Sequence, residues 1–134
     1  MAFKPYNKFK NVKKTTVDGI IFDSNEESLY YKLLKNKVEG KEIKSFTMQV
    51  PYLLQDGFYW IDKITGKKKK IQDIEYICDF LVINNDDTET VIDVKSGLTI
   101  KEQTFLIKIK MLKNRYRDID FRIVIRQKGI WIEK

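Results

Sequence analysis

Three charged residues in two apolar segments carry the strongest chemical signal in this sequence. Asp79 interrupts the apolar run Tyr76–Ile83, and Asp93 and Lys95 lie in the run that begins at Val91. A buried carboxylate is costly unless it is paired, hydrogen-bonded or bound to a metal. Because side chains alternate between the faces of a strand, Asp93 and Lys95 share one face. The spacing predicts a site where two carboxylates and one ammonium group meet.

Such a site has the equipment for metal-assisted hydrolysis. Two neighbouring carboxylates repel each other, and a divalent cation removes that repulsion. Ligands that are all oxygen favour Mg²⁺ or Mn²⁺. Lys95 can then orient an attacking water or hold a phosphate oxygen as negative charge builds. A purely structural ion pair between Asp93 and Lys95 is the alternative, and the residues alone leave both readings open.

Two antiparallel strands joined by a tight turn would place the acids side by side. Residues 68–84 are predicted to form one long strand, Asn84–Asp87 a turn, and residues 88–95 the returning strand. The run Tyr76–Ile83 is apolar at both alternations, so this strand is expected to be buried on both faces.

The remaining segments alternate between strand and helix patterns. Asp18-Gly19 predicts a hairpin over residues 15–22. Ser24 and Glu27 form a capping-box pattern, which starts a helix that stops near Gly40. Further elements are expected at residues 42–54 (strand), 99–116 (helix), 121–125 (strand) and 130–132 (strand). We therefore expect an α/β fold, with a mixed central sheet flanked by helices, in one domain over residues 15–134.

Composition narrows the chemistry and the partners. The 134 residues include no histidine and only one cysteine, Cys78, which excludes imidazole catalysis, an internal disulfide framework and a Cys/His zinc site. Lys and Arg number 26 against 19 Asp and Glu, for a net charge of +7. Residues 1–14 are predicted to be a basic flexible arm, and Lys67–Lys70 form a second basic run. This balance favours a nucleic-acid partner over a membrane, although a solvated surface has the same appearance.

Location is read from what the sequence does not contain. The start of the chain has no apolar core of a signal peptide, and no apolar run approaches the length that spans a bilayer. A cytoplasmic protein is expected.

The ordered set of motifs resembles the PD-(D/E)XK nuclease superfamily, and within it a family of small phage and prophage proteins related to Holliday-junction resolvases. The resemblance spans roughly residues 12 to 125, from the Val-Asp-Gly hairpin to the second helix, and its centre is Asp79 followed by Asp93-Val94-Lys95. The sequence departs from the pattern at Cys78, where a proline is common, and at Asp93, where glutamate is frequent. The Lys67–Lys70 run lies outside the shared motifs.

The resemblance implies a restriction-endonuclease-like fold and a metal-dependent endonuclease that cuts DNA, with a Holliday junction or another branched DNA as substrate. Asp79, Asp93, the Val94 carbonyl and Glu27 would hold Mg²⁺ or Mn²⁺, and Lys95 would assist catalysis. Cutting both strands of a symmetric junction implies a homodimer. The setting would be the cytoplasm of a bacterial host, as part of DNA recombination.

Other candidates have weaker support. Glu26 competes with Glu27 as the acid of the first helix. Gln49, Lys101 and Lys108 are candidate DNA contacts near the site, and Lys68, Lys69 and Lys70 are candidates in the second basic run. Phe58, Tyr59 and Trp60 are either core residues or a wedge or dimer contact. Two rival functions remain: a nuclease acting on nicks, flaps or transposon ends, and a non-catalytic basic DNA-binding protein.

Overall fold

The computed structural model describes residues 15–96 and 101–134, so the predicted basic arm at residues 1–14 lies outside the described residues. The described chain folds into nine strands and two helices. In chain order they are β1 (Thr15–Val17), β2 (Ile20–Phe22), α1 (Asn25–Glu39), β3 (Ser45–Gln55), β4 (Phe58–Ile61), β5 (Lys68–Ile71), β6 (Ile74–Ile83), β7 (Glu89–Lys95), α2 (Gln103–Arg115), β8 (Phe121–Gln127) and β9 (Ile130–Glu133).

A five-stranded mixed sheet is the centre of the molecule. Its order is β3-β6-β7-β8-β9, and all neighbours are antiparallel except β7 and β8, which are parallel. The parallel pair follows from the connection through α2, because parallel strands need a long crossover. The predicted α/β class with a mixed central sheet is confirmed.

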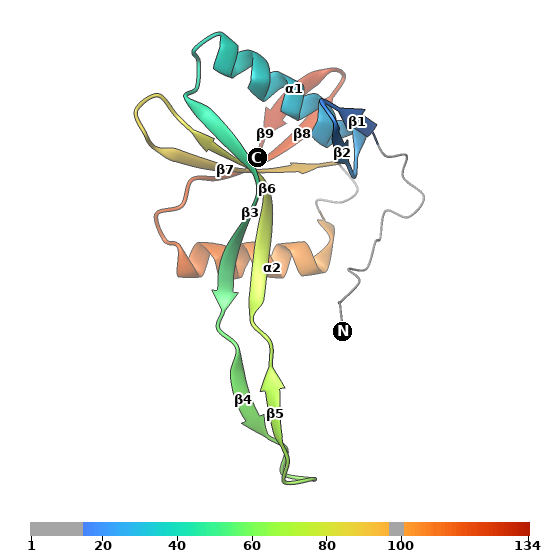
Figure 1. Cartoon of the computed structure of the whole chain (residues 1–134), viewed down its shortest axis with the longest axis vertical. Coiled ribbons are helices and arrows are strands. Elements are labelled where there is room, and N and C mark those ends of the chain that lie inside the picture. Colours follow the sequence, from blue (N-terminus) through green and yellow to red (C-terminus); the bar gives the residue numbers. More distant parts are fainter. Residues whose placement is uncertain (1–14, 97–100) are drawn as a thin grey trace.

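One helix covers each face of the sheet (Figure 1). Helix α1 packs Tyr30, Tyr31 and Leu34 into a core with the sheet residues Phe80, Val82, Ile92, Val94 and Val124. Helix α2 packs Phe105, Ile109 and Leu112 into a second core with Tyr76, Cys78 and Val91. Neighbours in β7 divide between the two cores, Val91 facing α2 and Ile92 facing α1, as alternation requires.

Local signals act as expected around α1. Asp18 and Gly19 both have positive φ, 52° and 76°, which is the backbone that a two-residue hairpin turn needs. Ser24 caps α1 by accepting a hydrogen bond from the backbone N–H of Glu27 at 3.1 Å, and Gly40 is the C-cap. The hairpin and the helix boundaries are confirmed.

The predicted long strand over residues 68–84 is wrong in one respect. It is broken at Gln72 and Asp73 into β5 and β6, and β4 with β5 forms a separate two-stranded sheet. This β4–β5 arm, residues 58–71, projects away from the rest of the chain (Figure 1). The break lies opposite Gly57, where an added Cβ would stand 3.0 Å from the Ile71 carbonyl oxygen. Glycine permits this close passage of two backbones.

The second helix also starts later than its apolar pattern suggests. Helix α2 begins at Gln103, because the Glu102 side chain accepts hydrogen bonds from the backbone N–H groups of Thr104 and Phe105 at 3.2 and 3.0 Å. A carboxylate in that position is a strong N-cap. Residues 97–100, which the predicted helix partly included, lie outside the described residues.

Candidate active site

The strand pair β3–β6 is distorted at the level of Asp79. Met48 pairs with Phe80 and Val50 pairs with Cys78, and between them Gln49 and Asp79 face each other without forming a ladder pair. Gln49 has φ of 55°, a left-handed backbone that a residue other than glycine rarely adopts. Strain of this kind persists only where surrounding structure holds it, and it is concentrated at functional sites.

The distortion reverses which face each strand shows to the two helices. Cys78 and Tyr76 belong to the core under α2, whereas Phe80 and Val82, at the same alternation, belong to the core under α1. Strand β3 reverses in the same way between Met48 and Val50. Asp79 therefore lies where the regular alternation fails. Ile77, expected to be buried, is 53% exposed.

Strands β6 and β7 separate at the same level. Their recorded pairing runs from Ile83 and Glu89 to Phe80 and Ile92, and the next positions along this register are Asp79 and Asp93. Beyond that point, the carboxylate of Asp79 accepts the backbone N–H of Val94 at 2.7 Å. A side chain thus replaces the strand ladder, and the two acids come together where the strands part.

Asp93 is held in a buried network below this opening. It is 3% exposed, and it accepts a hydrogen bond from the hydroxyl of Tyr76. The Lys95 Nζ lies 3.1 Å from Asp93 Oδ1 and 4.3 Å from the centre of the Phe105 ring. Three contacts therefore fix the positions of Asp93 and the Lys95 ammonium group, which restricts the freedom of a long side chain.

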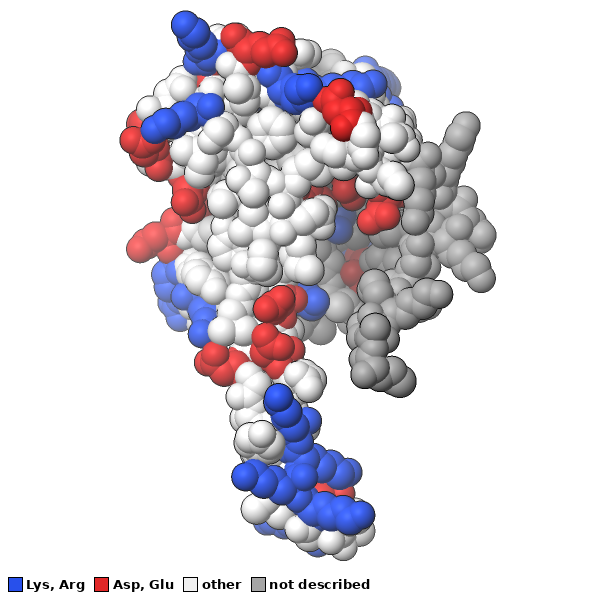
Figure 2. Space-filling view, viewed as in Figure 1, with Lys and Arg blue, Asp and Glu red and all other residues white. Residues whose placement is uncertain are grey.

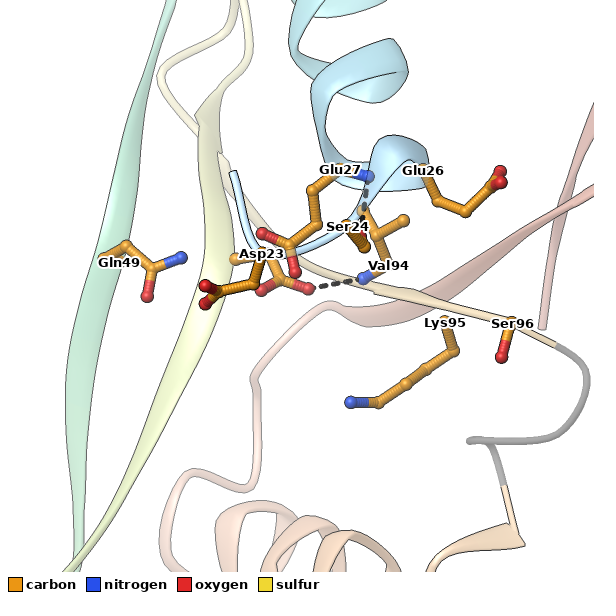
Figure 3. Close-up of a pocket in the computed structure, with 9 residues that line it drawn as sticks. Asp23, Ser24, Glu26, Glu27, Gln49, Val94, Lys95 and Ser96 are labelled. Atoms are coloured by element: carbon orange, nitrogen blue, oxygen red, sulfur yellow. Dashed lines mark hydrogen bonds between the residues drawn. The ribbon is translucent and has the colours of Figure 1, made fainter. Parts of the chain in front are cut away.

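Of the two acids in the first turn of α1, Glu27 is the one whose side chain is directed toward the other carboxylates. The two side chains diverge in Figure 3, where Glu27 is directed toward Asp23 and Val94 while Glu26 is directed away. Glu26 forms an ion pair with Arg126 Nε of β8 at 3.1 Å. The capping box is only half formed, since the Glu27 backbone N–H donates to Ser24 while its carboxylate turns to the pocket.

Two cavities flank these residues and share Asp79 and Lys95. The first, about 230 Å³, is lined by Glu27, Asp79 and Lys95, together with Asp23, Ser24, Glu26, Gln49, Val94 and Ser96. The second, about 290 Å³, opens toward α2, and its lining includes Tyr76, Asp93 and Lys108. Asp79 and Lys95 are therefore accessible from both sides.

The electrostatics show a crowded group of acids. Burial, followed by the negative charges of Asp23 and Asp93, raises the pKa of Glu27 to about 7. Burial, followed by the charges of Asp93 and Glu27, holds the pKa of Asp79 well above its usual value. The hydrogen bond from Val94 and the charge of Lys95 oppose that rise. The carboxylates are thus under-compensated by the positive charge near them.

The structure separates the predicted DNA contacts into near and distant groups. Gln49 points into the first cavity, and Lys108 lines the second. Lys101 does not share a helix face with Lys108, because it precedes the first residue of α2, and it is exposed. Lys68, Lys69 and Lys70 are exposed on β5, in the projecting arm.

Two residues near the acids were not singled out in the sequence. Tyr76 donates to Asp93, and Asp23 lines the first cavity and adds negative charge near Glu27. Asp23 could have been found from its place beside the cap residue Ser24. Tyr76 gave no signal, because a tyrosine in an apolar strand is usually a core residue.

Within the part of the chain that the structure describes, no three Asp, Glu or Cys side chains are arranged to hold a metal ion by themselves. Any cation here would depend on backbone oxygen or water in addition to side chains. Neither described helix combines the length and hydropathy that crossing a bilayer demands.

Comparison with known proteins places the chain in a family without assigning an activity. No curated protein matches the chain, and no solved structure does. One family model, described as a protein of unknown function (DUF1064), matches residues 6–130. That range includes every element from β1 to the start of β9 and all the acids around Lys95. The chain therefore belongs to the DUF1064 family.

Proposed function

We propose that this protein is a Mg²⁺- or Mn²⁺-dependent endonuclease that hydrolyses DNA phosphodiesters, with branched DNA such as a four-way junction as its substrate. The observation that carries the proposal is the convergence of Glu27, Asp79, Asp93 and Lys95 from one helix and two strands, at a break in the sheet. Resemblance to the PD-(D/E)XK nucleases supports the same reading and supplies the choice of substrate.

The donor set fits a hard divalent cation. Asp79 and Asp93 would be its carboxylate ligands, with the Val94 carbonyl and Glu27 completing the protein's share. Mg²⁺ usually keeps several waters and uses only one or two carboxylates, so a complete cage of protein acids is not required. Burial and then nearby negative charge raise the pKa values of Glu27 and Asp79, and a bound cation would offset both effects. When bound, the ion would polarise the phosphate and lower the pKa of a water.

Lys95 would act on the substrate itself. Its side chain is 18% exposed, so it is partly shielded from water, and it lines both cavities. Asp93 and Phe105 hold it in place before a substrate arrives. A positioned cation can bind a non-bridging phosphate oxygen and stabilise the charge that grows as the attacking water adds. Tyr76 would keep Asp93 oriented, because burial and the charge of Asp93 raise the pKa of its hydroxyl and keep it protonated.

A structural ion pair is the plainest alternative, and it accounts for less. It would explain Asp93, Lys95 and the Tyr76 hydroxyl. It gives no reason for Glu27 and Asp79 to lie beside an open cavity, where burial and neighbouring acids, Asp93 among them, raise the pKa of both. Carboxylates in that position destabilise a protein that has no ligand for them.

The decisive experiment incubates the protein with a synthetic four-way junction and with linear duplexes of the same sequences, with and without Mg²⁺. We expect metal-dependent, paired cuts at symmetric positions on opposing strands of the junction, made by a homodimer. Equal cutting of flaps, nicks or linear ends would reject the junction as substrate and leave the nuclease chemistry standing. Tight binding without cleavage in either metal would reject the nuclease.

A further inference from the structure

The β4–β5 arm exposes large apolar side chains to solvent, and these side chains pack in neither of the two cores. No residue between 56 and 73 belongs to either core. Tyr59 is 61% exposed, Trp60 50% and Ile64, at the tip, 95%. Isolated exposed apolar residues are ordinary, but aromatic rings on a projecting strand form a surface suited to contact. Of the two readings of this segment, core and contact, the structure excludes core.

Lysines are interleaved with these rings. In the register of the arm, Tyr59 faces Lys70 and Trp60 faces Lys69, so each face of the two-stranded sheet carries both an aromatic ring and an ammonium group. The Lys68 Nζ lies 4.4 Å from the centre of the Tyr59 ring. Figure 2 shows positive side chains gathered along the arm. Residues 58–71 contain five lysines and one acid, Asp62, which pairs with Lys69 at 3.1 Å.

The positive charge of the β4–β5 arm indicates which kind of partner it binds. Exposed acids, Asp56, Asp73 and Glu75, lie at the base of the arm, so the positive charge is concentrated toward its tip. A second copy of the arm, paired edge to edge through β5, would bring two lysine strands together, and like charges directly opposite are destabilising. A polyanion with flat apolar groups matches both features, because lysines meet phosphates while bases stack on the rings.

We propose that the β4–β5 arm binds unpaired bases of a DNA strand, with Tyr59 and Trp60 as the stacking residues and Lys68, Lys69 and Lys70 as the phosphate contacts. The choice of DNA rests on the proposed function. Branched DNA exposes the faces of bases where its helices part, whereas a continuous duplex keeps those faces stacked. The arm would therefore give the protein a preference for structure without reading sequence.

The test measures binding of the full chain, in EDTA, to a fluorescent single-stranded oligonucleotide and to the matching duplex. We expect Tyr59→Ala with Trp60→Ala to lower single-strand affinity by about tenfold or more, in line with typical stacking losses, and duplex affinity by less than about threefold. The matched control is Ile21→Ala with Ile130→Ala, which removes exposed apolar side chains at 67% and 66% exposure outside the arm. It should leave both affinities unchanged.

A second readout is intrinsic fluorescence, since the chain has only two tryptophans, Trp60 and Trp131. Trp131 packs against Tyr30 at 4.9 Å between ring centres, far from the arm. Single-stranded DNA should quench the wild-type emission, and Trp60→Phe should abolish the quenching while keeping most of the affinity. Equal melting temperatures of all variants would verify that they fold.

Two outcomes would overturn the arm proposal. One is unchanged affinity and unchanged quenching in the aromatic variants. The other is loss of a homodimer, seen by sedimentation, with DNA affinity intact, which would make the arm a contact between copies. The binding test does not depend on cleavage. A protein that cuts no DNA but still binds through the arm would reject the proposed nuclease and support the arm proposal. A protein that cuts DNA but whose arm variants bind as well as the wild type would support the nuclease and reject the arm proposal.

Discussion

The acid pocket, formed by Glu27, Asp79, Asp93 and Lys95, differs from the β4–β5 arm in burial, charge and construction. The pocket is assembled from α1, β6 and β7, is partly buried and contains more negative than positive charge. The arm is one continuous segment, is exposed along its length and is basic. Buried charges interact strongly because little water screens them, while exposed charges act mainly through long-range attraction.

Under the proposed function, this contrast would separate catalysis, in the pocket, from DNA binding, on the arm. Side chains that stabilise a transition state need fixed positions, which the pocket provides through Tyr76, Asp93 and Phe105 around Lys95. Side chains that bind a polyanion need only be numerous and long enough to contact its phosphates, and the lysines of the arm meet both conditions. Changes in one region should therefore leave the other region's contribution intact.

The largest expected effect is on turnover. Lys95→Ala should lower the cleavage rate by about 10²- to 10³-fold, because its proposed role is in the transition state. Binding of the same DNA in EDTA should change by less than about threefold. The matched control is Lys35→Ala, which removes a surface partner of Asp18 on α1. An equal fall in DNA affinity and cleavage rate would make Lys95 a binding residue. It would contradict the division of catalysis and binding between the pocket and the arm.

Neutralising the arm should give the next largest effect. Changing Lys68, Lys69 and Lys70 together to Ala should weaken DNA binding and lower the slope of log affinity against log salt by about 2 to 3. The cleavage rate at saturating DNA should not change. Lys32, Lys35 and Lys44, exposed at the other end of the molecule, form a control with the same loss of charge. An unchanged salt slope would show that the arm lysines do not meet phosphates.

Metal binding should appear as stabilisation. Mg²⁺ or Mn²⁺ should raise the melting temperature of the wild type, and at tenfold to hundredfold excess over the dissociation constant the gain is about 1–3 kcal/mol. Asp79→Asn should abolish this gain, whereas Asp87→Asn, at an exposed ion pair with Lys44, should keep it. If Asp79→Asn loses cleavage but keeps the stabilisation by metal, Asp79 is not a ligand.

The last prediction concerns pH and the metal-free protein. Because the pKa of Glu27 is about 7 in the folded chain and 4.5 in a free side chain, the folded state binds more protons between these values. Stability should therefore fall as pH rises from about 4.5 to 7, by about 1–3 kcal/mol for this group. Glu27→Gln should flatten the decline in urea unfolding measured from pH 4.5 to 8. Glu26→Gln, one residue away and paired with Arg126, should not.

The sequence was informative where the cause is local. The adjacency of β6 and β7, the Asp18-Gly19 turn and the Ser24 cap each depend on a few neighbouring residues, and each is confirmed. Asp79 next to Asp93 followed from a tight turn and a period of two. The choice between Glu26 and Glu27 could not be made, since it depends on Arg126, which is about a hundred residues away.

The errors arise where tertiary structure overrides a local pattern. The positive φ of Gln49 and the reversal of faces at Asp79 have no sequence signal, because neither Gln49 nor its neighbours are residues that favour a left-handed backbone. The apolar pattern therefore predicts Ile77 in the core, whereas it is exposed. The apolar period continues upstream and so predicts Lys101 on the second helix, whereas the Glu102 N-cap makes α2 begin only after that residue. The break at Gln72 could not be predicted from its own segment, because it depends on the close approach of Gly57 from the opposite strand.

Despite the break between β5 and β6, the arm continues roughly in line with the strand that carries Asp79 (Figure 1). The distance between the aromatic rings of the arm and the acid pocket is therefore set by the length of the strand. Tyr59 pairs with Lys70, nine positions before Asp79, so the stacking rings stand at most about 30 Å from the acid pocket at the rise of an extended strand. Stacked nucleotides advance about 3.4 Å each, so this length corresponds to about nine of them. A strand held on the arm would present its backbone to the pocket at a set number of nucleotides from the held bases, and the position of a cut would be counted from the branch point.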